Sequence, residues 1–264
     1  MNYMNLKRYS GLLFITVLLL YIVYPYTVYS HIGSVPAYFT ILQPTLSYSF
    51  LSSRKKQGGS VLLTLFPSAL FLLYAYATPS HYNSNFGYSI LFSVGLLFVL
   101  HTIPKSKYKT LAYVLTIALL VTAIVCFGLL LKDPSVKAWA DTKLYDFSMC
   151  RLIGSSPHTV HLDKLNYGDA PFACLLHKLG YLPTITIIIL YTVLLVLLSR
   201  RSTVGKLFSL IIGIQLFLSL LYSISPHAAA LCWYLRVMVP GITPGLKSCL
   251  LCPIICIAER LLKD

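Results

Sequence analysis

Long apolar runs alternate with short polar segments along nearly the whole chain, and each run is close to the roughly 20 residues that a helix needs to cross a bilayer. Residues 31–53 contain Pro36, Gln43 and Pro44, so we predict either a kinked span or a re-entrant segment there. A last helix from Cys249 to the end of the chain is short for a full crossing. The other spans are predicted over residues 11–29, 61–78, 88–103, 111–131, 182–198 and 207–224.

This pattern predicts an all-α fold, a polytopic transmembrane helical bundle with about seven or eight spans. We divide the chain into residues 1–110, a set of transmembrane helices whose role the sequence does not define, and residues 111–264. The second part is predicted to be a four-helix unit with a large hydrophilic loop over residues 132–180 and a terminal helix that carries a CxxC motif.

Composition and charge orient the bundle. A mean hydropathy of +0.77 with 11% charged residues excludes a soluble domain. Five of the seven acidic residues lie within the loop at 132–180, whereas 11 of the 21 basic residues form short clusters between spans. The positive-inside rule therefore places the amino terminus in the cytoplasm and the loop outside. The net charge of +14 follows from this topology, so the partner is the lipid bilayer and no nucleic acid is expected. The basic clusters are Lys7-Arg8, Arg54-Lys55-Lys56, Lys105-Lys107-Lys109 and Arg200-Arg201-Lys206.

Several functional classes lack their usual sequence features. No charged residue lies in the middle of a predicted span before the last helix, which disfavours ion-coupled transport and proton pumping. The chain contains no Walker motif, no HExxH and no GxSxG. ATP-driven transport and membrane proteolysis by those motifs are therefore unsupported.

The cysteines are distributed unevenly. Six of the seven lie in the second half of the chain, within or beside segments predicted to be external, and none lies before residue 126. Thiols on the oxidising side of a membrane favour disulfides. Cys150 and Cys174 share the external loop, and the simplest interpretation is a structural disulfide worth about 3 kcal/mol through the entropy of the unfolded chain.

Cys249-Leu-Leu-Cys252 is the more specific motif. A helix amino terminus acidifies a thiol, so two cysteines at this spacing can form a redox-active pair. The alternative is that they are ordinary small apolar residues of a membrane helix, the role that we assign to Cys126 and Cys256. Both interpretations of Cys249 and Cys252 remain open at this point.

The histidines of the loop could hold a metal ion. His158, His161 and His177 lie with Asp163 in the same segment, but in a polar loop solvated side chains are the more frequent case. We therefore predict no metal site.

The second half of the chain resembles vitamin K epoxide reductase and the DsbB-like membrane thiol–disulfide oxidoreductases. The shared features are a helix, an outer loop with two cysteines, two helices, and a CxxC at the start of a final helix. The sequence CLLC followed by IAER is similar to the C-x-L-C and nearby Glu-Arg of DsbB proteins, although Arg260 follows Cys252 by eight residues instead of four. The segment HKLGYLP after Cys174 is also similar.

The resemblance covers residues 111–264 and implies a mechanism. Cys249 and Cys252 would pass electrons to a quinone, and Cys150 and Cys174 would exchange disulfides with a soluble thioredoxin-like partner. Arg260 or His227 could polarise a quinone carbonyl. The expected function is thus a quinone-linked disulfide oxidoreductase of a bacterial inner membrane. The alternative is a non-catalytic membrane component, such as a transporter, an assembly subunit or an immunity-type protein, with structural disulfides in its outer loops.

Overall fold

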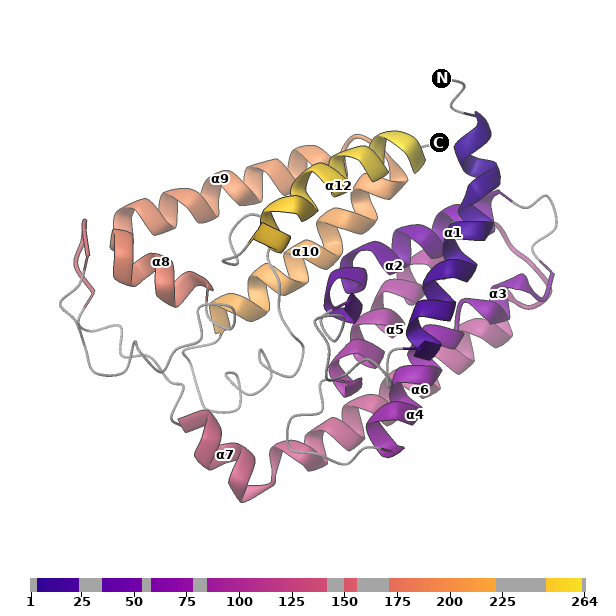
Figure 1. The fold of residues 1–264 in the computed structure, drawn as a ribbon, viewed down its shortest axis with the longest axis horizontal. Coiled ribbons are helices and arrows are strands. Elements are labelled where there is room, and N and C mark those ends of the chain that lie inside the picture. Colours follow the sequence, from indigo (N-terminus) through magenta and orange to yellow (C-terminus); the bar gives the residue numbers. More distant parts are fainter. Residues whose placement is uncertain are drawn as a thin grey trace.

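The computed structural model describes residues 4–23, 35–53, 58–77, 85–141, 150–155, 171–221 and 246–262. These residues form helices and no strand, which confirms the predicted all-α fold for this part of the chain (Figure 1). The helices are α1 (Met4–Val23), α2 (Val35–Ser52), α3 (Ser60–Leu63), α4 (Phe66–Ala77), α5 (Asn85–Thr102), α6 (Lys109–Leu131), α7 (Pro134–Asp141), α8 (Pro171–Leu179), α9 (Tyr181–Ser199), α10 (Thr203–Leu221) and α12 (Leu246–Leu262).

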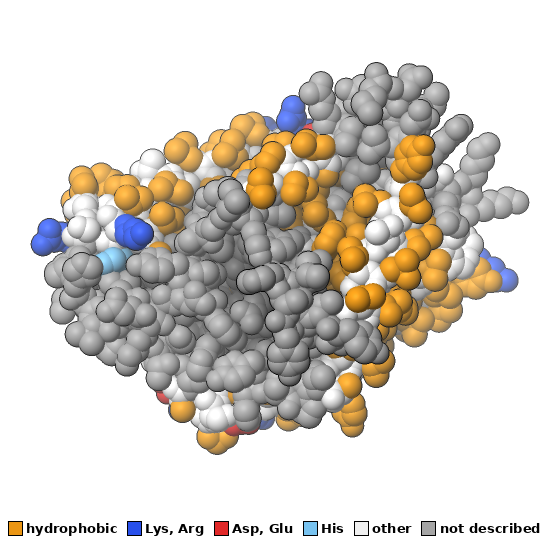
Figure 2. Space-filling view, in the orientation of Figure 1, with side chains coloured by type: hydrophobic (Ala, Val, Ile, Leu, Met, Phe, Trp, Pro, Cys, Tyr) orange, Lys and Arg blue, Asp and Glu red, His pale blue; other side chains and the backbone are white. Residues whose placement is uncertain are grey.

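Five of these segments are long and apolar enough to cross a membrane, namely α3 with α4, α5, α6, α9 and α10. Hydrophobic side chains cover the described surface along α9, α12 and α1, whereas Lys and Arg atoms lie towards the ends of the molecule (Figure 2). The protein is therefore a membrane protein. The total of seven or eight spans, which needs α1, α2 and α12 as well, stays a prediction.

The doubtful stretch at residues 31–53 contains one continuous helix, α2, with Pro44 in its interior. Proline removes one backbone hydrogen bond and widens a helix locally. The structure accommodates the ring at the contact with α5, where Gly95 has no side chain and a Cβ would collide with the Pro44 ring. The same Cβ would meet Ile211 Cδ1 of α10 at 3.2 Å, so α2, α5 and α10 approach closely at this level.

The core is built on α5, which packs against α2, α4 and α6, and on α10, which packs against α9, α2 and α12. Its hydrophobic cluster includes Phe14, Val99, Ala112, Phe208 and Ile255, so it continues across residue 110. The division of the chain into residues 1–110 and 111–264 stays a prediction, and the two parts share one core.

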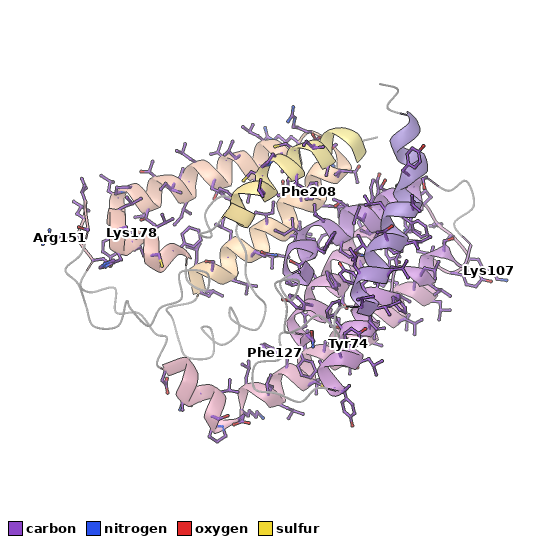
Figure 3. All side chains as sticks on the ribbon, viewed as in Figure 1. Tyr74, Lys107, Phe127, Arg151, Lys178 and Phe208 are labelled. Atoms are coloured by element: carbon purple, nitrogen blue, oxygen red, sulfur yellow. The ribbon has the colours of Figure 1, made fainter. Side chains whose placement is uncertain are left out.

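Basic side chains lie at both ends of the bundle. Figure 3 shows Lys107, in the turn between α5 and α6, on the opposite side of the molecule from Arg151 and Lys178. Ser10 of α1 donates to the carbonyl of Ser49 at the end of α2 (3.4 Å), which brings the start of α1 to the same end as the end of α2. The α5–α6 turn and the segment with Arg151 thus lie on opposite sides of the molecule, and the assignment of the first to the cytoplasm stays a prediction.

Within its described residues, the predicted hydrophilic loop at 132–180 is partly helical. It contains α7 and α8, and each of them begins at a proline, a residue favoured in the first turn of a helix. Before α7, the Asp133 carboxylate accepts hydrogen bonds from the Ser135 amide (2.9 Å) and hydroxyl (2.7 Å). Val136 of α7 then packs against Phe127 of α6.

Candidate functional site

The segment from Cys150 to Ser155 is bound to the corner between α8 and α9 by three backbone hydrogen bonds. The amide of Gly154 donates to Leu179 O (2.9 Å), and the amides of Tyr181 and Leu182 donate to Arg151 O and Leu152 O (both 3.0 Å). The first amides of a helix have no partner within it. The carbonyls of the segment therefore cap the start of α9, while its Gly154 amide caps the end of α8.

Gly180 makes this corner possible. Its φ of 88° is in the left-handed region that favours glycine. A Cβ at this position would lie 2.8 Å from both Arg151 O and Leu152 O and 2.9 Å from Ile153 Cα. Any side chain would therefore strain the backbone and push the segment away from the corner.

The docked segment places Cys150 beside the helix that carries Cys174. Cys150 precedes Arg151, whose carbonyl is bound to the start of α9, and it is half-buried. Cys174 lies five residues before Leu179, about 8 Å along α8, and is only 4% exposed. No disulfide joins two cysteines within the described residues. The pairing of Cys150 with Cys174 stays a prediction.

His177 lies on the same face of α8 as Cys174. Residues three apart in a helix are neighbours on its surface, with Cβ atoms about 5–6 Å apart. His177 is 7% exposed, whereas the adjacent Lys178 is exposed. α8 packs against α9 and α10. The α8–α9 corner thus collects two thiols and a buried imidazole.

The CxxC motif belongs to the first half of α12. Cys252 is exposed on α12 and interacts electrostatically with Tyr191 of α9. Tyr191 comes ten residues after Tyr181, the first residue of α9, and therefore about 15 Å along the helix from the α8–α9 corner. The backbone of Cys249 belongs to α12, but its side chain is outside the described residues.

The position of the CxxC motif along α9 follows from the way in which α12 is anchored. Ser202, in the turn between α9 and α10, donates to the Glu259 carboxylate (3.0 Å), and Glu259 is 6% exposed. α12 has 17 residues and a length of about 25 Å. Because its carboxyl end is held at the turn, its amino end reaches only part of the way along α9.

The remaining predicted residues lie elsewhere. Arg260 follows Glu259 near the α9–α10 turn, about 12 Å along α12 from Cys252, and its side chain is outside the described residues. His227 is also outside them, as are His158, His161 and Asp163. Among the residues described, no group of His, Cys, Asp or Glu side chains could hold a metal ion.

Sequence analysis did not identify Gly180, Tyr191 or Glu259 as parts of the site. For Gly180 a signal was present, because Pro171 and Gly180 are the start and stop residues that bracket a short helix. The roles of Tyr191 and Glu259 are defined by contacts between helices that are distant in the sequence, although Glu259 belongs to the IAER segment quoted for the resemblance.

Cys126 and Cys256, which we interpreted as ordinary small residues of membrane helices, lie on α6 and α12. The resemblance to vitamin K epoxide reductase and DsbB rests on the residues quoted for it. Comparison with protein-family models, with curated proteins and with solved structures found no match to this chain.

Proposed function

We propose that the protein is an integral membrane thiol–disulfide oxidoreductase that takes electrons from a soluble thioredoxin-like protein and passes them to a membrane quinone. The observation that carries this proposal is the docking of the Cys150 segment on the α8–α9 corner. This docking brings the half-buried thiol of Cys150 close to α8, the helix that carries the buried thiol of Cys174. The corner lies at the end of the bundle opposite Lys107. An oxidising outer compartment, such as that facing a bacterial inner membrane, suits this chemistry.

The difference in burial gives the two cysteines of the corner different roles. In the disulfide form, a thiolate of the soluble partner attacks the sulfur of Cys150, because the sulfur of Cys174 is shielded. The bond between Cys150 and Cys174 breaks, and Cys174 leaves as a thiolate. The second thiol of the partner then attacks the mixed disulfide and displaces Cys150. The partner has lost two electrons and two protons, and the corner has gained them.

Cys249 and Cys252 form the second pair. Their disulfide is reduced by the thiols of Cys150 and Cys174, and the resulting dithiol gives two electrons and two protons to the quinone. The residues around Cys252 fit a quinone headgroup. Tyr191 offers a hydroxyl donor, and the neighbouring side chains of α12 are apolar and exposed, namely Leu250, Ile254 and Ile257. Arg260 and His227 stay predicted quinone contacts.

Exchange between the two pairs requires direct sulfur–sulfur contact, whereas the corner and Cys252 are separated by about 15 Å along α9. The proposal therefore includes a movement that brings the corner and the amino end of α12 together during each cycle. Movements of this kind occur on the microsecond-to-millisecond timescale.

The double variant Cys249→Ser, Cys252→Ser tests the proposal. It should retain insertion and fold but lose reduction of a soluble quinone analogue by reduced thioredoxin, because no thiols remain to pass the electrons on. Absorbance of the quinone gives the rate. Cys256→Ser, on the same helix, is the matched control and should keep the wild-type rate. A double variant that reduces quinone normally would contradict the proposal.

A second candidate function, that of a non-catalytic component such as a transporter, is favoured by uncharged polar side chains within the core. Tyr21 donates to Gln43 Oε1 (3.1 Å), and Gln215 donates to Thr40 Oγ1 (3.3 Å). All four residues are buried between α1, α2 and α10. Such groups are expensive in a membrane and often mark a path for a polar solute. Full biological activity of the Cys249→Ser, Cys252→Ser variant would favour this candidate.

A further inference from the structure

The α8–α9 corner contains a titratable group that the exchange steps above do not use. His177 is buried on the face of α8 that also carries Cys174, and the two residues are three positions apart. Burial of a histidine removes water from its ring and is costly unless the ring has a polar neighbour. Cys174, one turn away on this face of α8, is a thiol within reach of the ring.

We propose that His177 is the acid–base partner of Cys174, which protonates its sulfur when the bond between Cys150 and Cys174 is opened. This inference rests on the proposed function and adds the group that controls its rate. The partner's thiolate forms a bond to Cys150, and the electron pair of the broken disulfide goes to Cys174. The imidazolium of His177 gives its proton to that sulfur and becomes neutral. In the reverse direction, neutral His177 takes the proton of Cys174 and generates the attacking thiolate.

The chemistry of the buried thiol requires such a group. A thiolate without water or a cation is a poor leaving group, because disulfide opening slows as the pKa of the leaving thiol rises. Cys174 is 4% exposed, so water stabilises its thiolate poorly. Cys150 is half-buried and has more access to solvent. The sulfur that requires a proton donor is therefore that of Cys174, which lies one helical turn from His177.

Few other titratable or charged groups lie on the described elements around this face. Within its described residues, α10 has one charged side chain, Lys206, which lies in the first turn of the helix. On the elements that pack against the His177 face, these groups are Cys150 and Arg151 on the docked segment, Tyr181 on α9, and Cys174 and Lys178 on α8. The comparison of wild type with variants of His177 therefore decides whether a pH dependence in this range comes from His177.

The test measures how fast reduced glutathione opens the Cys150–Cys174 disulfide in the full-length protein in detergent. The disulfide is formed with diamide, and the linked peptides are quantified by mass spectrometry at pH values from 5.5 to 8. Each rate is divided by the concentration of glutathione thiolate. Because His177 becomes protonated as the pH falls, the wild-type rate per thiolate should rise about tenfold towards pH 5.5.

His177→Gln should give a rate per thiolate that does not change with pH and is about tenfold lower than wild type at pH 6. His177→Lys, which keeps a cation, should restore the rate without restoring its pH dependence. Lys178→Gln, the adjacent exposed position, should behave as wild type. A flat wild-type profile, or a His177→Gln profile identical to wild type, would overturn the inference and leave the proposed function intact. A protein in which no Cys150–Cys174 disulfide forms would overturn both.

Discussion

Replacement of Cys174 by serine is expected to abolish turnover and to trap the protein as a mixed disulfide through Cys150. The probe is thioredoxin with a single active-site cysteine, activated by 5-thio-2-nitrobenzoate. Cys150 of the reduced protein attacks this cysteine and displaces the nitrobenzoate. In wild type, Cys174 then attacks Cys150 and releases reduced thioredoxin. In Cys174→Ser no thiol of the corner can do so, and the adduct should persist on a non-reducing gel.

The converse variant should behave differently. In Cys150→Ser the remaining thiol of the corner is that of Cys174, which is 4% exposed, so a protein-sized reagent cannot reach it. We expect at least about tenfold less adduct than in Cys174→Ser. Cys126→Ser, on α6, is the control and should match wild type. Equal adduct from the two corner variants would show that burial does not assign the roles as proposed.

Gly180→Ala is expected to release the docked segment from the α8–α9 corner. Alanine at a φ of 88° is strained, and its Cβ would lie 2.8 Å from two carbonyl oxygens. Together with loss of the three backbone hydrogen bonds, this should lower the free energy of unfolding by about 2–4 kcal/mol. Unfolding in SDS measures the stability, and faster hydrogen exchange at the Tyr181 and Leu182 amides localises the change.

Two other glycines serve as matched controls. Gly154 also has a left-handed φ, 89°, but a Cβ there would meet no atom within 4 Å. Gly154→Ala should therefore cost only the backbone strain, about 1 kcal/mol. Gly128 on α6 has an ordinary helical backbone and equally open surroundings, so its alanine variant should be neutral or slightly stabilising. A Gly180→Ala protein as stable as Gly154→Ala would argue against the close packing of this corner.

The membrane helices could be predicted from the sequence because a span is defined by one continuous apolar run. The helices α5 and α6 begin within three residues of the predicted positions, 88 and 111. The helices α7 and α8 were missed because polar composition was given more weight than their starting prolines. In α2, Pro44 left the choice between a span and a re-entrant segment open, since the accommodating residue, Gly95, belongs to another helix.

The candidate site was predictable only in part. The unequal distribution of cysteines drew attention to Cys150 and Cys174, but the hydrogen bonds that bring Cys150 to the corner link backbone atoms about 30 residues apart, for which no sequence pattern exists. The position of Cys252 relative to α9 was not predictable for a similar reason. It depends on the anchoring of Glu259 by Ser202, a contact between side chains that lie 57 positions apart.

The central claim is that Cys150 and Cys174 form a disulfide that opens and closes during function. Peptide mapping of protein alkylated within intact membranes tests this claim directly. We predict that the two cysteines are linked to each other in the resting protein, are both alkylated after addition of reduced thioredoxin, and are linked again after addition of quinone. If both cysteines are alkylated under all three conditions, the claim is wrong.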